Sequence, residues 1–182
     1  MKNALVLHGT EDSPNSNWFE WLEVELTKRG YKVWLPKLPE SETPNMREYV
    51  SFLMNNDFNY NSETIIIGHS SGAVAIFGLL SKIKTKINSA YLVSAFKDNL
   101  DWDALDGLFE EPFNFAEIQD KAEKIILIHS DTDPYGPLED AKYLSEQVNG
   151  KLVVLKGQGH FNTGSNPKYT KFPELLELIT QD

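Results

Sequence analysis

The sequence contains no cysteine among its 182 residues. Disulfide bridges, thiolate metal sites and a cysteine nucleophile are therefore excluded, so any nucleophilic chemistry must come from another side chain. The chain also lacks a metal-binding pattern such as His-Glu-x-x-His and a glycine-rich phosphate-binding loop. We expect no metal ion and no nucleotide cofactor.

An excess of positive charge is also missing. Seventeen lysines and arginines stand against 27 aspartates and glutamates, which gives a net charge of −10. Nucleic acids and anionic membranes bind to basic patches, whereas the lysines here are scattered along the chain. We expect neither class of partner. The acidic run over 98–111 is typical of a solvated face.

Long apolar runs are absent as well. No stretch reaches the roughly 18 consecutive apolar residues of a membrane-spanning helix. The first apolar run, over residues 4–7, is followed by His8 and Gly9 and is too short for a signal peptide. A cytoplasmic protein is therefore expected.

Short apolar runs alternate with amphipathic segments along the whole chain. The runs predict strands at 4–7, 31–35, 64–67, 89–93, 125–128 and 152–155. The segments predict helices from Trp18, from Thr43 as N-cap, after Ser70, and over 137–148 and 172–180. Strands that alternate with helices form a parallel sheet covered on both faces. We predict one α/β domain over 1–182, a three-layer α/β/α sandwich around a mostly parallel sheet of about six strands.

The segment 97–118 interrupts this alternation. It mixes aromatic and leucine side chains with acids and one proline, which predicts one or two short helices inserted between strands. In one interpretation these side chains pack as a cap on the core. In an alternative, residues 98–115 form a protein-binding surface on a chain with little or no turnover, because exposed apolar patches mark interaction sites.

The most informative motif is Gly68-His69-Ser70-Ser71-Gly72, which joins a predicted buried strand to a predicted helix. Its two glycines remove the Cβ atoms that would collide in a sharp strand-to-helix turn. The central serine can then hold its hydroxyl clear of the backbone. Ser70 is therefore the predicted nucleophile.

A serine hydroxyl needs a base to remove its proton, and the base needs a carboxylate to orient it. His160 lies in a glycine-rich loop after the last predicted strand and is the predicted base. Asp131 and Asp133 both follow the preceding strand. Asp133 is preferred because Pro134 restricts it to an extended conformation, whereas Asp131 can bond within its own loop. The order serine, aspartate, histidine is that of an α/β-hydrolase.

The tetrahedral oxyanion of such a reaction needs backbone donors. The N–H of Ser71, at the start of the helix after the nucleophile, is the first. The second is expected from the loop after the first strand, through Thr10 or alternatively Glu11. The other histidines each adjoin a strand end and are expected to be structural: His8, His69 and His129.

With these residues assembled, the chain resembles the small single-domain α/β-hydrolases of the retinoblastoma-binding protein 9 type, the YdeN-like serine hydrolases. The block Gly-His-Ser-Ser-Gly-Ala after an isoleucine run is the most specific match. The matching stretches span nearly the whole chain: 5–9, Trp18-x-x-Trp21-Leu22, 64–73, 92–95, 130–134 and Gly159-His160-Phe161.

The resemblance implies a compact hydrolase without the first antiparallel strands of larger relatives. It places a catalytic triad on Ser70, Asp133 and His160, and so supports Asp133 over Asp131. We expect cleavage of a small ester, thioester or amide through an acyl-enzyme. The segments 98–111 and 162–170 look individual to this chain and flank the predicted site, so the resemblance implies least about the substrate.

Overall fold

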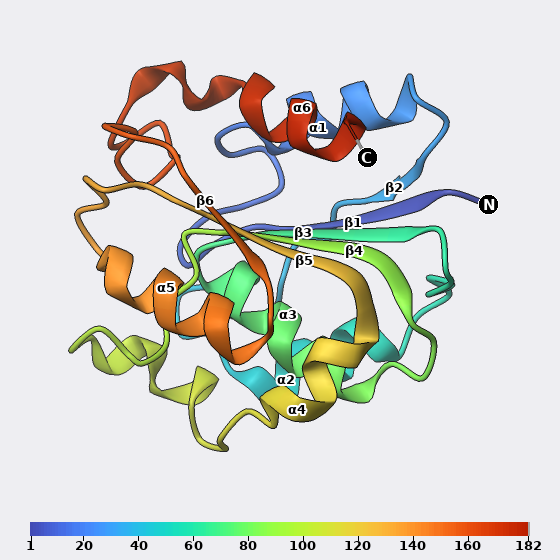
Figure 1. Cartoon of the computed structure of the whole chain (residues 1–182), viewed down its shortest axis with the longest axis horizontal. Coiled ribbons are helices and arrows are strands. Elements are labelled where there is room, and N and C mark those ends of the chain that lie inside the picture. Colours follow the sequence, from blue (N-terminus) through green and yellow to red (C-terminus); the bar gives the residue numbers. More distant parts are fainter. Residues whose placement is uncertain (182) are drawn as a thin grey trace.

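The computed structural model describes residues 1–181, and its centre is one six-stranded sheet (Figure 1). All neighbouring strands are parallel, in the order β2-β1-β3-β4-β5-β6. The predicted parallel sheet of about six strands is confirmed. The strands are β1 (Asn3–Leu7), β2 (Lys32–Trp34), β3 (Thr64–His69), β4 (Ile87–Val93), β5 (Ala122–His129) and β6 (Lys151–Val154).

Helices cover both faces of the sheet and complete the three layers. In Figure 1, α1 (Phe19–Thr27) and α6 (Pro173–Thr180) lie on one face. On the other face lie α2 (Met46–Met54), α3 (Ser71–Lys82), α4 (Phe115–Ile118) and α5 (Leu138–Gln147). Short 3-10 helices lie between these elements at Asp103–Leu108, Gln119–Lys121 and Pro167–Thr170. No helix in residues 1–181 is both long and apolar enough to cross a membrane.

The start of α2 differs from the prediction. Its N-cap is Asn45 and not Thr43, because the Asn45 side chain accepts hydrogen bonds from the N–H groups of Arg47 and Glu48 at 3.0 and 3.3 Å. Pro44 supplies no N–H and separates the threonine from the first turn. Asparagine is also the stronger N-cap of the two residue types.

The inner strands are buried on both faces, which is why their sequences read as continuous apolar runs. Leu5, Leu7 and Ile66 belong to the hydrophobic cluster beneath α3. Ala4 and Ile67 belong to the cluster beneath α1 and α6. Side chains alternate between faces along a strand, so one run contributes to both cores. Each fully buried leucine or isoleucine stabilises the fold by about 1.5–3 kcal/mol.

The insert over 97–118 packs mainly onto the core beside α3. Leu105, Leu108 and Ile118 are buried in that cluster. The ring of Phe113 lies 5.4 Å from that of Phe77 in α3, measured between centroids. Trp102 is the exception and is 44% exposed. The apolar side chains of the insert thus act chiefly as a cap on the core.

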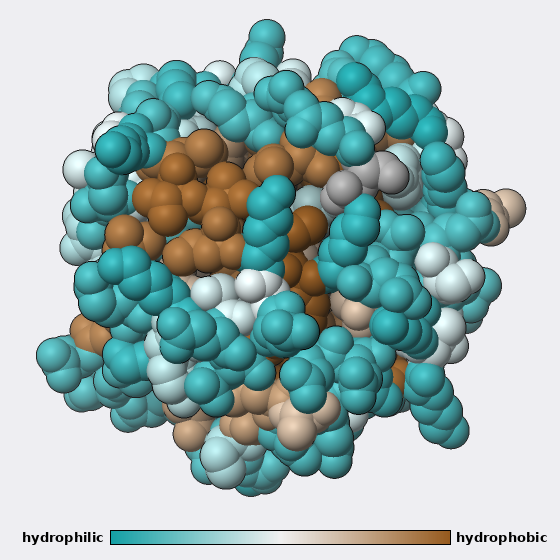
Figure 2. Space-filling view, in the orientation of Figure 1, coloured by the Kyte–Doolittle hydropathy of each residue, from teal (hydrophilic) through white to brown (hydrophobic). Residues whose placement is uncertain are grey.

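Strand β6 forms one edge of the sheet. Figure 2 shows hydrophobic surface around this strand, on the face of the molecule turned to the viewer. Val154 is 38% exposed there, and β6 has only four residues, beginning with Lys151. A short edge strand that carries a charged residue is poorly suited to pairing with strands of other chains.

Candidate active site

The predicted nucleophile lies in the turn between β3 and α3. Ser70 has φ of 55° and ψ of −125°, a backbone conformation that is costly for any residue other than glycine. Its N–H donates to the carbonyl of Val93 at 2.9 Å. A Cβ on Gly72 would overlap the carbonyl oxygens of Leu7 and His8, so the glycine is what lets α3 approach β1 this closely. Strain held in place by packing is typical of functional residues.

The predicted base and the predicted acid are joined by a hydrogen bond. His160 Nδ1 lies 2.8 Å from Oδ2 of Asp133 and 3.0 Å from Oδ1. The Asp133 side chain is fully buried and that of His160 is 7% exposed. An ionised carboxylate only accepts hydrogen bonds, so Nδ1 carries the proton. The lone pair of Nε2 is then available to take up another proton.

Asp131, the alternative acid, has a different partner. Its Oδ1 accepts a hydrogen bond from the N–H of Gly157 at 2.7 Å, and its side chain is exposed. The two aspartates therefore have different structural roles. Asp131 ties the loop after β5 to the loop after β6, and Asp133 reaches the histidine.

Sequence reasoning missed a fourth polar residue at this point. Ser94, which follows β4, donates its hydroxyl to Oδ2 of Asp133 at 2.7 Å. The N–H of Tyr135 donates to Oδ1 at 3.0 Å. Ser94 is buried and has a positive φ of 52°. The available signal was its position, because it follows a predicted strand at the edge of the sheet where the other site residues gather.

A cavity of ≈ 550 Å³ is lined by the predicted nucleophile and base and by parts of the two segments that look individual to this chain. Ser70, His160 and Thr10 line it. The insert supplies three of the apolar lining residues, Leu100, Trp102 and Leu105, beside Phe96, Pro134 and Tyr135. The polar lining residues include Glu11, Asp12, Asn17, Asn162 and Thr163. Residues from 97–118 and from 162–170 thus both border the site, as expected.

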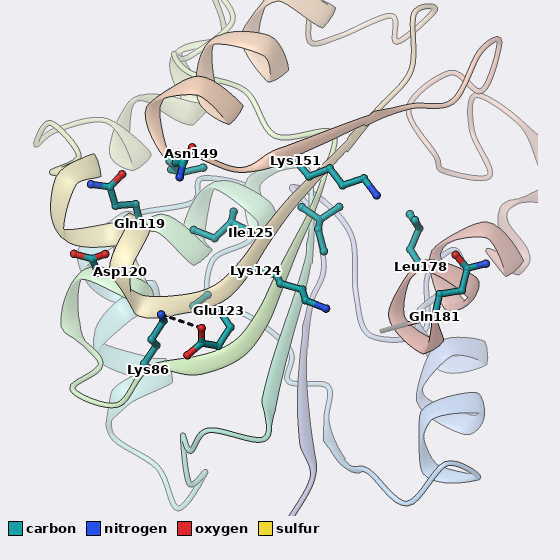
Figure 3. Close-up of a pocket in the computed structure, with 13 residues that line it drawn as sticks. Lys86, Gln119, Asp120, Glu123, Lys124, Ile125, Asn149, Lys151, Leu178 and Gln181 are labelled. Atoms are coloured by element: carbon teal, nitrogen blue, oxygen red, sulfur yellow. Dashed lines mark ion pairs between the residues drawn. The ribbon is translucent and has the colours of Figure 1, made fainter.

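A second cavity of ≈ 500 Å³ lies at the opposite, amino ends of β4, β5 and β6 (Figure 3). Lys86 and Glu123 form an ion pair of 3.0 Å beside it. Its described lining contains no serine and no histidine. It therefore lacks the serine nucleophile and the histidine base that the sequence predicts, and the cavity at Ser70 is the candidate active site.

A sequence model of serine hydrolases matches residues 4–181. The chain belongs to the serine hydrolase family. The serine hydrolase RBBP9 of Rattus norvegicus is 26% identical to it over 175 residues, which cover 94% of this chain and 89% of the rat protein.

Solved structures of hydrolases share the fold. The product of ydeN from B. subtilis superposes with a TM-score of 0.92 and is 24% identical, over 100% of this chain and 98% of that one. A YdeN-like hydrolase from Pectobacterium atrosepticum gives 0.70 at 18% identity, with 100% and 90% of the two chains covered. The α/β-hydrolase architecture is thus confirmed, and this serine hydrolase is an enzyme of that class.

The loop after β1 supplies the candidate oxyanion donors of this serine hydrolase. The N–H of Glu11 already donates to the carbonyl of Ser41 at 3.1 Å, which favours Thr10 over Glu11. Ser71 is the first residue of α3, where an N–H has no partner within the helix. The hydroxyls of Thr10 and Ser71 are buried without a hydrogen-bond partner in residues 1–181.

Two of the other histidines hold loops at this edge of the sheet. The N–H of Leu38 donates to Nε2 of His8 at 2.9 Å, so Nδ1 of His8 carries the proton and donates to the Gly9 carbonyl at 2.9 Å. This pair of bonds fixes the loop that leads to Thr10. His129 donates through Nε2 to the carbonyl of Gly136 at 3.0 Å and so closes the turn that contains Asp133.

The pKa values of His160 and Asp133 are both lowered, the first because of burial and the second in spite of it. Burial lowers the pKa of His160 below its ordinary value of 6.5, and Asp133 only partly opposes this. Burial acts to raise the pKa of Asp133, but His160, Ser94 and the N–H of Tyr135 outweigh it and hold that pKa below its ordinary value. At neutral pH the pair is a neutral imidazole beside a carboxylate, the state that a general base requires.

The pH dependence of kcat/KM should reflect the buried imidazole. The reaction needs neutral His160, and protonation removes the base only below its lowered pKa. We expect kcat/KM to stay constant as the pH falls and to decline with a midpoint below 6.5. Ester hydrolysis followed from pH 4.5 to 8 measures this. A midpoint above 6.5 would contradict the assignment.

The two aspartates allow a matched comparison. Asp133→Asn should lower kcat by about 10³- to 10⁴-fold, because an amide favours the wrong tautomer of His160. Asp131→Asn keeps the acceptor for the Gly157 N–H and should change kcat by less than about fivefold. Steady-state kinetics and melting temperatures of both variants provide the check. A larger loss of kcat in Asp131→Asn than in Asp133→Asn would identify Asp131 as the acid.

Proposed function

We propose that this serine hydrolase cleaves a small ester, thioester or amide through an acyl-enzyme on Ser70. One observation carries the proposal. A strained serine in a strand-to-helix turn shares a cavity with His160, whose Nδ1 is bound to buried Asp133 at 2.8 Å. Nucleophile, base and orienting carboxylate are the three parts that acyl transfer to a serine requires.

In the first half-reaction the oxygen of Ser70 attacks the carbonyl carbon while Nε2 of His160 takes the hydroxyl proton. The negative oxygen is met by the N–H groups of Ser71 and Thr10. When the intermediate collapses, His160 gives its proton to the leaving group and the acyl-enzyme remains. Water then repeats the sequence, with His160 again as base, and releases the acid. Asp133 stays ionised and stabilises the imidazolium.

The residues that line the cavity limit the range of possible substrates. It contains the carboxylates of Glu11 and Asp12, and no lysine or arginine among the described residues. A substrate with a carboxylate or phosphate would lose hydration without gaining a cationic partner. Neutral acyl groups that pack against the apolar side chains of the lining are therefore favoured. An ester is the best-supported linkage, because an alkoxide leaving group demands less of the acid step than an amine does.

The alternative of a protein-binding module is less well supported. It requires an exposed apolar surface on the insert, but Leu105 and Leu108 are buried in the core. Trp102, the exposed aromatic residue, lines the cavity that contains Ser70. The insert therefore contributes to the substrate site, and we propose no protein partner for it.

A fluorophosphonate probe tests the nucleophile directly. The wild-type protein should be labelled covalently at Ser70, because the probe phosphonylates only an activated serine. Ser70→Ala should abolish labelling, and His160→Ala should slow it strongly by removing the base. Intact-mass and peptide mass spectrometry identify the modified residue. A folded wild-type protein that stays unlabelled would refute the proposed function.

The carboxylates of Glu11 and Asp12 in the cavity lining predict that the enzyme selects substrates by charge. The p-nitrophenyl ester of butyrate should be hydrolysed with a kcat/KM at least about tenfold above that of the p-nitrophenyl monoester of succinate, which has a similar length and a free carboxylate. Glu11→Gln should narrow this ratio without slowing the neutral ester. Equal rates for both esters in the wild type would show that the carboxylates do not govern substrate choice.

A further inference from the structure

His69 is a buried histidine that takes no part in the reaction described above. It directly precedes Ser70 and is only 1% exposed. Its Nε2 lies 2.7 Å from the backbone carbonyl oxygen of His160. A carbonyl oxygen only accepts, so Nε2 of His69 carries a hydrogen and donates it. The residue next to the nucleophile is thus bonded to the backbone of the base.

The other ring nitrogen of His69 faces a carboxylate. Nδ1 is buried and has no hydrogen-bond partner in residues 1–181, and Oδ2 of Asp12 lies 3.8 Å away. A Cβ on Gly9 would lie 3.3 Å from this nitrogen and 3.4 Å from Asp12 Oδ2, so the glycine keeps the space beside both groups open. With its hydrogen on Nε2, the ring presents only an acceptor lone pair at Nδ1, which a carboxylate cannot satisfy, and an unsatisfied buried nitrogen costs about 1–3 kcal/mol.

Asp12 is itself held in place. The amide nitrogen of Asn17 donates to both Asp12 oxygens at 3.1 Å. Burial acts to raise the pKa of Asp12, but interactions with His69, His8 and Asn17 outweigh it and keep that pKa below its ordinary value. The carboxylate is therefore ionised where it faces the imidazole.

The same segment of the chain holds the loop of His160 at two further points. Asn17 accepts from the N–H and the hydroxyl of Thr163 at 2.9 and 3.1 Å. Trp18 donates through its indole nitrogen to the carbonyl of Phe161 at 2.9 Å. Phe161 has a positive φ of 53°, a conformation that persists only when its surroundings impose it. The loop that presents the base is thus fastened by its neighbours.

We propose that His69 is a positioning residue for the base. Its hydrogen bond from Nε2 acts on the His160 backbone, whereas Asp133 acts on the His160 ring. Together they fix both ends of the residue and place Nε2 for proton transfer with Ser70. The proposal rests on the proposed function, because it takes His160 as the base.

Two substitutions of His69 distinguish the effect of its hydrogen-bond donor from the effect of the rest of its side chain. In His69→Gln the amide nitrogen reaches about as far as Nε2 and can still donate to the His160 carbonyl. In His69→Asn a polar group remains near the place of Nδ1, but the donor is too short. We expect His69→Asn to lower kcat by about 10- to 100-fold with little change in KM, since small misplacements of a base have effects of this size.

His69→Gln should keep kcat within about threefold of the wild type. Rescue by the longer amide, with equal melting temperatures for both variants, is a result that a merely structural role would not produce. Unchanged kcat in His69→Asn, or an equal loss in both variants, would overturn the proposal.

A spectroscopic readout separates this proposal from the proposed function. The Nδ1 proton of His160, bonded to Asp133, should give a low-field proton resonance in NMR spectra recorded on Ser70→Ala, which needs no turnover. His69→Asn in that background should shift or broaden the resonance, and His69→Gln should leave it in place. If neither variant alters the resonance, the positioning role of His69 is overturned, even in an enzyme that the fluorophosphonate labels. If the resonance shifts as expected, the positioning role is supported even when labelling fails.

Discussion

The close approach of α3 to β1 is the constraint on which the rest of the site depends. The backbone of α3 at Gly72 lies so near the carbonyl oxygens of Leu7 and His8 that no side chain fits between them. This contact places the strained turn at Ser70 directly beside the loop after β1. The proposed nucleophile and the loop with the proposed oxyanion donor are therefore neighbours because of one backbone packing contact. The burial of α3 holds that contact in place.

Around that contact, the proposed base, His160, is held by residues from several strand ends. Asp133 holds its ring, while His69 and Trp18 bind consecutive carbonyls of its loop. These supports are buried or half-buried and come from different segments of the chain. Precise placement of a side chain on a loop needs such independent contacts, because the loop has no ladder of hydrogen bonds of its own.

The parts predicted best from the sequence were those that local physics decides. Continuous apolar runs indicated the buried strands, and the two glycines around Ser70 indicated the turn. The prediction was wrong at the start of α2, where Asn45 caps the helix in place of Thr43, because asparagine is the stronger cap and directly precedes the first turn. Ser94 was missed because a serine after a strand carries no pattern, and its partner Asp133 lies 39 residues further along.

The sequence by itself determined the fold class, the serine in its turn, and the short list of acids and histidines at the strand ends. Periodicity and glycine sterics act between near neighbours, so they can be read from the residues in order. Only the tertiary structure decided which aspartate meets His160, which loop N–H remains unengaged, and what His69 binds. Those choices depend on distances of a few ångströms between residues far apart in the chain, which only the packing of the sheet and its helices defines.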